Sequence, residues 1–112
     1  MQSEKIIELY FNYWNKQDLE LLKTLFSKNV TLEDWEAKYE GIDSVIEANK
    51  NIFTKDPSIK INVIHVFDNK NEFAVLIDVL ISDKKILSVI DLIKIENGLI
   101  TFVKAFKKLL DS

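Results

Sequence analysis

The stretch ILSVIDLIKIENGLITFVKAF, residues 86–106, decides the fold class of this chain. Two runs rich in isoleucine, valine and phenylalanine, Ile86–Ile95 and Leu99–Phe106, flank the pair Asn97-Gly98. Asn-Gly between apolar runs is the strongest short-range signal for a β-hairpin, because both residues tolerate the positive φ values that a tight turn requires. The stretch therefore predicts two long antiparallel strands.

Two similar runs, Ile59–Phe67 and Phe73–Ile81, precede this hairpin. Polar turn residues at positions 68–71 separate them, and Asp83-Lys84 separates the second run from residues 86–106. Long apolar runs joined by short polar turns are typical of consecutive antiparallel strands. The second half of the chain is thus predicted to be a four-strand meander.

The first half has a different period. Its apolar residues recur at helical spacing in three segments. We expect a first helix capped by Ser3 and a short second helix that Asp18 caps and Lys28-Asn29 ends. A third helix is expected from about Asp43 to Phe53, before Pro57, the only proline.

A short strand is predicted at Val30–Asp34, where apolar and polar residues alternate. The expected order is therefore helix, helix, short strand, helix and meander, with no linker or repeat. Residues 1–112 are predicted to form a single domain of the α+β class, with three helices packed on a curved sheet around an apolar pocket.

Composition excludes several classes of function. The chain has 112 residues, no cysteine, one histidine, fifteen basic residues that are all lysine, and a net charge of −3. It therefore lacks thiol chemistry, a bidentate guanidinium clamp, a two-histidine metal site and the basic stripe that nucleic-acid binding needs. We expect no cofactor and no metal. A signal pattern and a membrane-length apolar run are both missing, so a cytoplasmic protein without membrane contact is expected.

Two aspartates are predicted on apolar strand faces, because side chains alternate across a strand. Asp91 shares its row with Val89 and Ile93, and Asp34 shares its face with Val30 and Leu32. A buried charge is costly unless it is paired or neutralised. These two acids are therefore candidate site residues.

The same alternation places His65 in a row with Ile61 and Val63, where a structural role is favoured over that of a base or ligand. Alternation leaves the face of Asp78 undecided. In the last strand it places Thr101 with Val103 and Ala105, and Ile100 with Phe102 and Phe106. Both sheet faces are apolar and three helices cover only one, so a homodimer packed through the outer sheet face is expected.

Several segments together resemble the nuclear-transport-factor-2-like superfamily, which includes the SnoaL-like polyketide cyclases and ketosteroid isomerase. The resemblance implies a cone-like α+β fold with a mixed or antiparallel sheet. It spans nearly the whole chain and rests on Leu9–Leu19, Leu25-Phe26, Val30–Asp34, Gly41 with Val45-Ile46, Val89–Asp91 and Asn97-Gly98.

The resemblance to ketosteroid isomerase also implies three site residues. Its base matches Asp34, its oxyanion tyrosine matches Tyr10, and its protonated aspartate matches Asp91. The implied activity moves a proton next to a carbonyl of an apolar small molecule. Trp35 stands where that enzyme has proline, and the third helix carries Ala48 and Asn49 where larger aromatic residues are expected.

These departures keep other functions open. One alternative is a non-catalytic domain that binds a small apolar ligand, and another is a dimerisation module. In either case Asp34 would bond loop amides, and Asp91 would bond Tyr10 or Tyr13. The residues expected to line the pocket are Trp14, Phe26, Trp35, Phe53, Val89, Val103 and Ala105.

Overall fold

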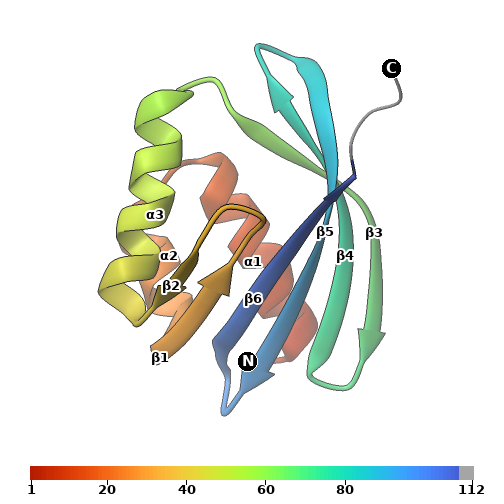
Figure 1. The fold of residues 1–112 in the computed structure, drawn as a ribbon. Coiled ribbons are helices and arrows are strands. Elements are labelled where there is room, and N and C mark those ends of the chain that lie inside the picture. The colour runs from red at the N-terminus through yellow and green to blue at the C-terminus, as the bar shows by residue number, and fades with distance from the viewer. Residues whose placement is uncertain (109–112) are drawn as a thin grey trace.

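The computed structural model describes residues 1–108 (Figure 1). Its one sheet has six strands in the order β2-β1-β6-β5-β4-β3, and it is not closed. Only β1 and β6 pair in parallel, so the sheet is mixed. The elements in chain order are α1 (Ser3–Asn15), α2 (Leu19–Leu25), β1 (Phe26–Glu33), β2 (Lys38–Glu40), α3 (Ile42–Lys55), β3 (Lys60–Asn69), β4 (Glu72–Ile81), β5 (Lys84–Glu96) and β6 (Leu99–Lys108).

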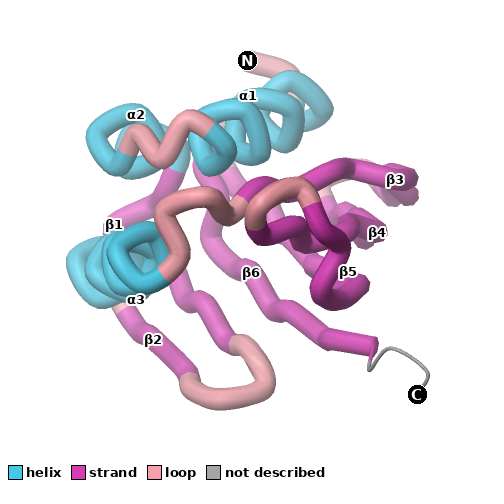
Figure 2. Tube along the Cα trace, turned by 90° about the horizontal axis from the view of Figure 1, so that it is seen from above, coloured by secondary structure: helices cyan, strands magenta, loops and turns pink. Residues whose placement is uncertain are grey.

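The predicted α+β class and the four-strand meander are confirmed. Asn97 and Gly98 form the β5–β6 turn with φ values of 52° and 77°, as an Asn-Gly hairpin requires. All three helices lie toward the inner face of the curved sheet, which leaves the outer face uncovered (Figure 2). No helix within residues 1–108 is long and apolar enough to cross a membrane.

The predicted end of the second helix is wrong. α2 ends at Leu25, and Phe26 already has extended backbone with φ −95° and ψ 143°. The Phe26 ring is buried, with its centroid 5.9 Å from that of Tyr10. This packing starts β1 earlier than local pattern indicates, and β1 also gains an unpredicted partner, β2.

The capping predictions had different outcomes. Asp18 caps α2, because its Oδ1 accepts a hydrogen bond of 3.0 Å from the Leu21 N–H. Ser3 does not cap α1. It lies inside the helix, and its Oγ donates to Oδ1 of Asn71 at 2.6 Å, so it ties α1 to the β3–β4 turn instead.

Four strand pairs contain a register shift, and two of these irregularities, both β-bulges, change the strand faces that alternation predicts. In β3, Val63 lies opposite Ile77 but His65 lies opposite Leu76, so the extra residue Ile64 shifts the alternation. His65 therefore lies on the outer face, with its ring centroid 4.3 Å from that of Phe67. The predicted row of His65 with Ile61 and Val63 is wrong for this reason.

The second bulge is at Thr101 in β6. Phe102 lies opposite Lys94, whereas Ile100 lies opposite Ile95. Ile100 is consequently on the inner face and fully buried, together with Val103. The prediction that Ile100 shares a face with Phe102 is wrong, because the inserted residue reverses the alternation.

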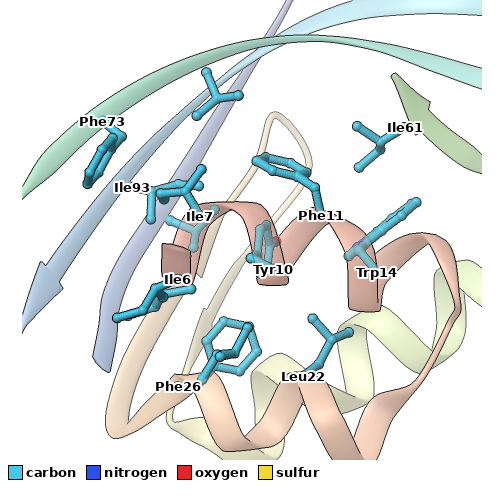
Figure 3. Close-up of a cluster of buried hydrophobic side chains, with 14 of the residues drawn as sticks. Ile6, Ile7, Tyr10, Phe11, Trp14, Leu22, Phe26, Ile61, Phe73 and Ile93 are labelled. Atoms are coloured by element: carbon cyan, nitrogen blue, oxygen red, sulfur yellow. The ribbon is translucent and has the colours of Figure 1, made fainter. Parts of the chain in front are cut away.

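The core lies between the inner face of the sheet and the helices. Helix α1 supplies five of its buried side chains, and Figure 3 shows them projecting between the sheet and the α2–β1 segment. Those five are Ile6, Ile7, Tyr10, Phe11 and Trp14.

Asn15 fastens the end of α1 to β3. Its Nδ2 donates to the Ile61 carbonyl at 2.8 Å, and its Oδ1 accepts from the Ile61 N–H at 2.7 Å. The side-chain amide therefore takes the place that a neighbouring strand's peptide group would have.

We expect Asn15→Ala to lower the free energy of unfolding by about 1–3 kcal/mol, because it leaves two partly buried backbone groups without partners. Denaturant unfolding of both proteins measures the difference. Asn12→Ala, at an exposed position of the same helix, is the control and should change stability by less than about 0.5 kcal/mol. Equal effects of the two substitutions would contradict the role of Asn15.

Candidate functional site

Asp91 is a buried carboxyl group in the middle of the sheet. It lies on the inner face of β5, opposite Val75 of β4 and Ala105 of β6. Val89 and Ile93 precede and follow it in the same row, and both are buried. The prediction of an acid in an apolar row is confirmed, since Asp91 is only 6% exposed.

Tyr10 approaches this acid from α1. Its ring is 5% exposed and packs edge-on against Phe11 at 4.9 Å and Phe26 at 5.9 Å between ring centroids (Figure 3). Among the hydrogen bonds of residues 1–108, none joins Tyr10 or Tyr13 to Asp91. The structure therefore brings Tyr10 and Asp91 into one apolar region, and neither group is hydrogen-bonded to the other.

Burial sets the protonation of both groups. It raises the pKa of Asp91 from 3.8 to about 7, because the apolar surroundings disfavour the charged form. Burial, followed by the nearby Asp91 charge, raises the pKa of the Tyr10 hydroxyl above its usual value. Near neutral pH, Tyr10 keeps its proton and a large share of Asp91 is protonated, so both can donate hydrogen bonds.

Asp34 has a different setting. It is half-buried and lies one residue past the end of β1. Its Oδ1 accepts from the Glu36 N–H at 2.8 Å and from the Ala37 N–H at 2.9 Å, and its own N–H donates to the Ala37 carbonyl at 3.0 Å. One carboxylate oxygen thus shapes the β1–β2 turn.

The strand register places Asp34 relative to Asp91. Glu33 lies opposite Lys104, and the next residue of β6, Ala105, lies opposite Asp91. Asp34 is therefore level with Asp91 and two strands away, a backbone separation of roughly 10 Å at the usual strand spacing. The two acids therefore lie at the same level along the strand direction. Asp34 is half-buried at the rim of the sheet, and Asp91 is buried in the core.

The predicted pocket-wall residues divide into two groups. Trp35 is 43% exposed, with the Lys107 Nζ 5.1 Å from its ring centroid, and Ala105 is half-buried. Two hollows, of about 260 Å³ and 240 Å³, open along β3, and neither is lined by Tyr10, Asp34 or Asp91. Contact of these residues with a ligand stays a prediction. The other five belong to the buried core: Trp14, Phe26, Phe53, Val89 and Val103.

Sequence reasoning missed the role of Asn49. This buried amide accepts a hydrogen bond from Trp14 Nε1 at 3.0 Å and donates to the Val45 carbonyl at 2.9 Å. Its position among the apolar residues of the third helix was the available signal. Asp78, which alternation left undecided, lies on the outer face, where it accepts a hydrogen bond from Ser88 and pairs with Lys85 at 3.4 Å. Within residues 1–108 no three acids or histidines gather as a metal site would require.

Residues 7–103 match the family model of the SnoaL-like domain. The chain belongs to the SnoaL-like family. Comparison with curated protein sequences finds no match. The resemblance to the nuclear-transport-factor-2-like superfamily is thereby confirmed, and it covers the helices, β1 and most of the meander.

Solved structures share this SnoaL-like fold at low sequence identity. A protein from Kribbella flavida, proposed to be a ketosteroid isomerase, is 18% identical with a TM-score of 0.86, over 99% of this chain and 81% of that one. An NTF2-like protein of unknown function from Cytophaga hutchinsonii is 17% identical, with a TM-score of 0.83 over 96% and 91%. A proposed SnoaL-like polyketide cyclase from Jannaschia sp. is 14% identical, with a TM-score of 0.82 over 96% and 85%. These likenesses establish the fold.

The raised pKa of Asp91 predicts a specific pH dependence of stability. Between pH 3.8 and about 7 Asp91 is ionised in the unfolded chain but protonated in the folded domain. The free energy of unfolding therefore decreases as pH rises through this window. The loss is on the order of 4 kcal/mol. Asp91→Asn, which stays neutral, should not show it.

The measurement is urea unfolding of wild type and Asp91→Asn at several values from pH 4 to pH 8. The stability of the variant relative to wild type should increase with pH and level off above about pH 7. Asp83→Asn, at an exposed turn position, is the control. A pH-independent difference between Asp91→Asn and wild type would show that the Asp91 carboxyl ionises normally in the folded domain.

Proposed function

We propose that this SnoaL-like domain binds a small apolar carbonyl compound at Tyr10 and Asp91 and moves a proton next to the carbonyl. The observation that carries the proposal is the buried Asp91, whose pKa is raised to about 7 beside the Tyr10 hydroxyl. Two groups that keep their protons in a dry site suit an oxygen that becomes negative during the reaction. The fold shared with a protein proposed to be a ketosteroid isomerase supports the same class of chemistry.

The proposed reaction shifts a carbon–carbon double bond into conjugation with the carbonyl. Asp34 takes a proton from the carbon between the carbonyl and the double bond, and the electron pair moves to the carbonyl oxygen to form an enolate. The Tyr10 hydroxyl and the protonated Asp91 carboxyl donate hydrogen bonds to that oxygen. Asp34 then returns the proton to the far carbon of the original double bond. The proton is conserved, and no oxidant is needed.

The different surroundings of the two acids support distinct tasks for them in the proposed reaction. Asp34 is half-buried at the rim of the sheet, and its side-chain contacts in the turn use only Oδ1, which leaves Oδ2 to take a proton from the substrate. Asp91 is enclosed by apolar side chains and donates only while it holds its proton. Turnover is therefore expected to decrease above about pH 7, as the protonated share of Asp91 declines.

The test monitors conjugated-enone formation from a β,γ-unsaturated ketosteroid by ultraviolet absorbance. Asp34→Asn should lower turnover at least about 100-fold, because the base is removed. Its amide oxygen can still accept the Glu36 and Ala37 N–H groups, so the turn should persist. Asp43→Asn, an exposed change on α3, is the control and should leave turnover unchanged. Wild-type turnover in Asp34→Asn would contradict the assignment.

One observation favours a second function, non-catalytic binding of a small apolar ligand. The Asp34 carboxylate already serves the β1–β2 turn through two hydrogen bonds, which is a sufficient structural role. A wild-type protein that is thermally stabilised by the ketosteroid yet does not convert it would support this function. In that case Asp34→Asn should leave the stabilisation unchanged.

We also propose that the domain forms a homodimer through the outer face of the sheet. Ile90 and Phe106 lie opposite each other on that face and are 44% and 49% exposed. A contiguous apolar patch of this kind on a sheet marks an interaction surface. A second copy presents the same patch, which is self-complementary about a two-fold axis. The patch consists of Phe67, Leu76, Ile90, Leu92, Phe102 and Phe106.

Ile90→Glu should convert the dimer into a monomer, because it puts a charge at the centre of the apolar patch. Analytical ultracentrifugation of the variant and wild type measures the mass in solution. Leu21→Glu replaces an exposed leucine on α2, away from the sheet, and should leave the dimer intact. A wild-type protein that is monomeric at high micromolar concentration would contradict the proposal.

A further inference from the structure

Strand β3 is a free edge of the sheet, and the bulge at Ile64 is the one protective feature in its middle. It is the last strand in the order β2-β1-β6-β5-β4-β3, and it is ten residues long. Val63, Ile64, Val66 and Phe67 are 39%, 48%, 40% and 59% exposed. Proteins normally shield such edges with inward charges, proline or a covering element, because an open apolar edge pairs readily with another strand. Inside the span 63–67 the strand has no proline and no lysine.

A hollow of about 240 Å³ lies beside this edge, between α1 and β3. Its apolar part is formed by Ile7 and Phe11 of the helix and by Val63 and Val66 of the strand. Ile7 and Phe11 project from α1 toward the sheet (Figure 3), and α1 runs on the side of the molecule next to β3 (Figure 2). The remaining lining is acidic: Glu4 and Glu8, both exposed.

The strand register shows which backbone groups of β3 face away from β4. Asn15 bonds both the N–H and the carbonyl of Ile61, so these two groups point outward. In an antiparallel strand the outward groups recur at every second residue, which places those of Val63 outward as well. The bulge at Ile64 shifts the pattern by one residue, so the next outward groups belong to Val66 and Asp68.

Val63 and Val66 therefore contribute both their side chains and their outward backbone groups to the hollow. They lie opposite Ile77 and Val75, which are buried, so their side chains are on the inner face and line the hollow. Their outward N–H and carbonyl groups form the edge of that hollow. At Ile61 the Asn15 amide pairs with this edge as the backbone of a neighbouring strand would. The edge continues from there to the end of β3.

We propose that β3 and this hollow bind an extended segment of a partner protein, which pairs with residues 63–68 as an added strand. Its inner side chains would be apolar and enter the hollow against Ile7 and Phe11. Lysine or arginine two residues away from them, on the same face of the added strand, would meet Glu4 and Glu8. The charge of the lining argues for a basic segment, because Glu4 and Glu8 are its only charged side chains. Of these two, only Glu8 has an ion-pair partner among the described residues, Lys5 at 3.4 Å in an exposed pair. Strand addition with alternate side-chain pockets is a known mode of peptide recognition.

The probe, called the lysine–valine peptide, is a fluorescein-labelled, acetylated and amidated octapeptide in which valine and lysine alternate at every second position and threonine fills the positions between them, so that valine and lysine share one face. Its counterpart, the glutamate–valine peptide, has glutamate in place of each lysine. Fluorescence anisotropy measures binding to the full chain. We expect saturable binding of the lysine–valine peptide and at least about tenfold weaker binding of the glutamate–valine peptide, since the latter meets Glu4 and Glu8 with like charge. Equal binding of both peptides, or binding of neither, would overturn the proposal.

Two variants locate the binding. Val66→Pro removes an N–H that faces away from β4, so the sheet keeps its ladder while the added strand loses a donor. Val66→Pro should weaken the binding of the lysine–valine peptide at least about tenfold. The double variant Glu4→Gln/Glu8→Gln should also weaken this binding. The matched control Glu20→Gln/Glu47→Gln changes two exposed residues on α2 and α3 and should leave the binding unchanged.

Circular dichroism verifies that each variant is folded, and the glutamine pair tests the site even if Val66→Pro fails to fold. Unchanged affinity of the lysine–valine peptide for both Val66→Pro and Glu4→Gln/Glu8→Gln would overturn the proposal. Self-association of wild type that Val66→Pro abolishes and Ile90→Glu preserves would assign the edge to a second copy of the chain, and this result would also overturn it.

Discussion

The pairing of β5 with strands on both sides is the interaction on which the rest of the structure depends. β5 joins β4, which carries the edge strand β3, and β6, which carries β1 and β2. Its inner row of Val89, Ile93 and Ile95 is buried in the same hydrophobic core as the apolar side chains of the three helices, and this burial helps to hold the helices on the sheet. Asp91 occupies the centre of that row. The carboxyl group thus lies on a strand that is paired on both sides, opposite Val75 and Ala105.

This placement links stability to chemistry. An ionised carboxylate in an apolar row would destabilise the domain, so the fold favours the protonated acid. A hydrophobic residue at position 91 would serve packing better, and the sequence retains an acid there. Residues that break the local pattern in this way are expected at functional sites. The SnoaL-like fold alone does not specify an activity, because structures with under 20% identity to this chain share it. The proposed activity therefore depends on Tyr10, Asp91 and Asp34 themselves.

Three surfaces of the domain are chemically distinct, and the two bulges help to separate them. The interior contains Tyr10 and Asp91. The outer sheet face presents Ile90 and Phe106, and the bulge at Ile64 adds His65 and Phe67 to it. The free edge of β3 borders the hollow beneath α1.

The sequence by itself determined the α+β class, the meander, the Asn97-Gly98 turn, the Asp18 cap and the burial of Asp91. These features depend on local propensity and on alternation within one strand, which short stretches of sequence encode. Only the tertiary structure decided where β1 begins, that β2 exists, that Ile64 and Thr101 bulge, and that the Asp34 carboxylate bonds Glu36 and Ala37. Each of these depends on a partner distant in sequence or on the exact register between strands. Alternation counted along one strand cannot detect an inserted residue that only the neighbouring strand reveals.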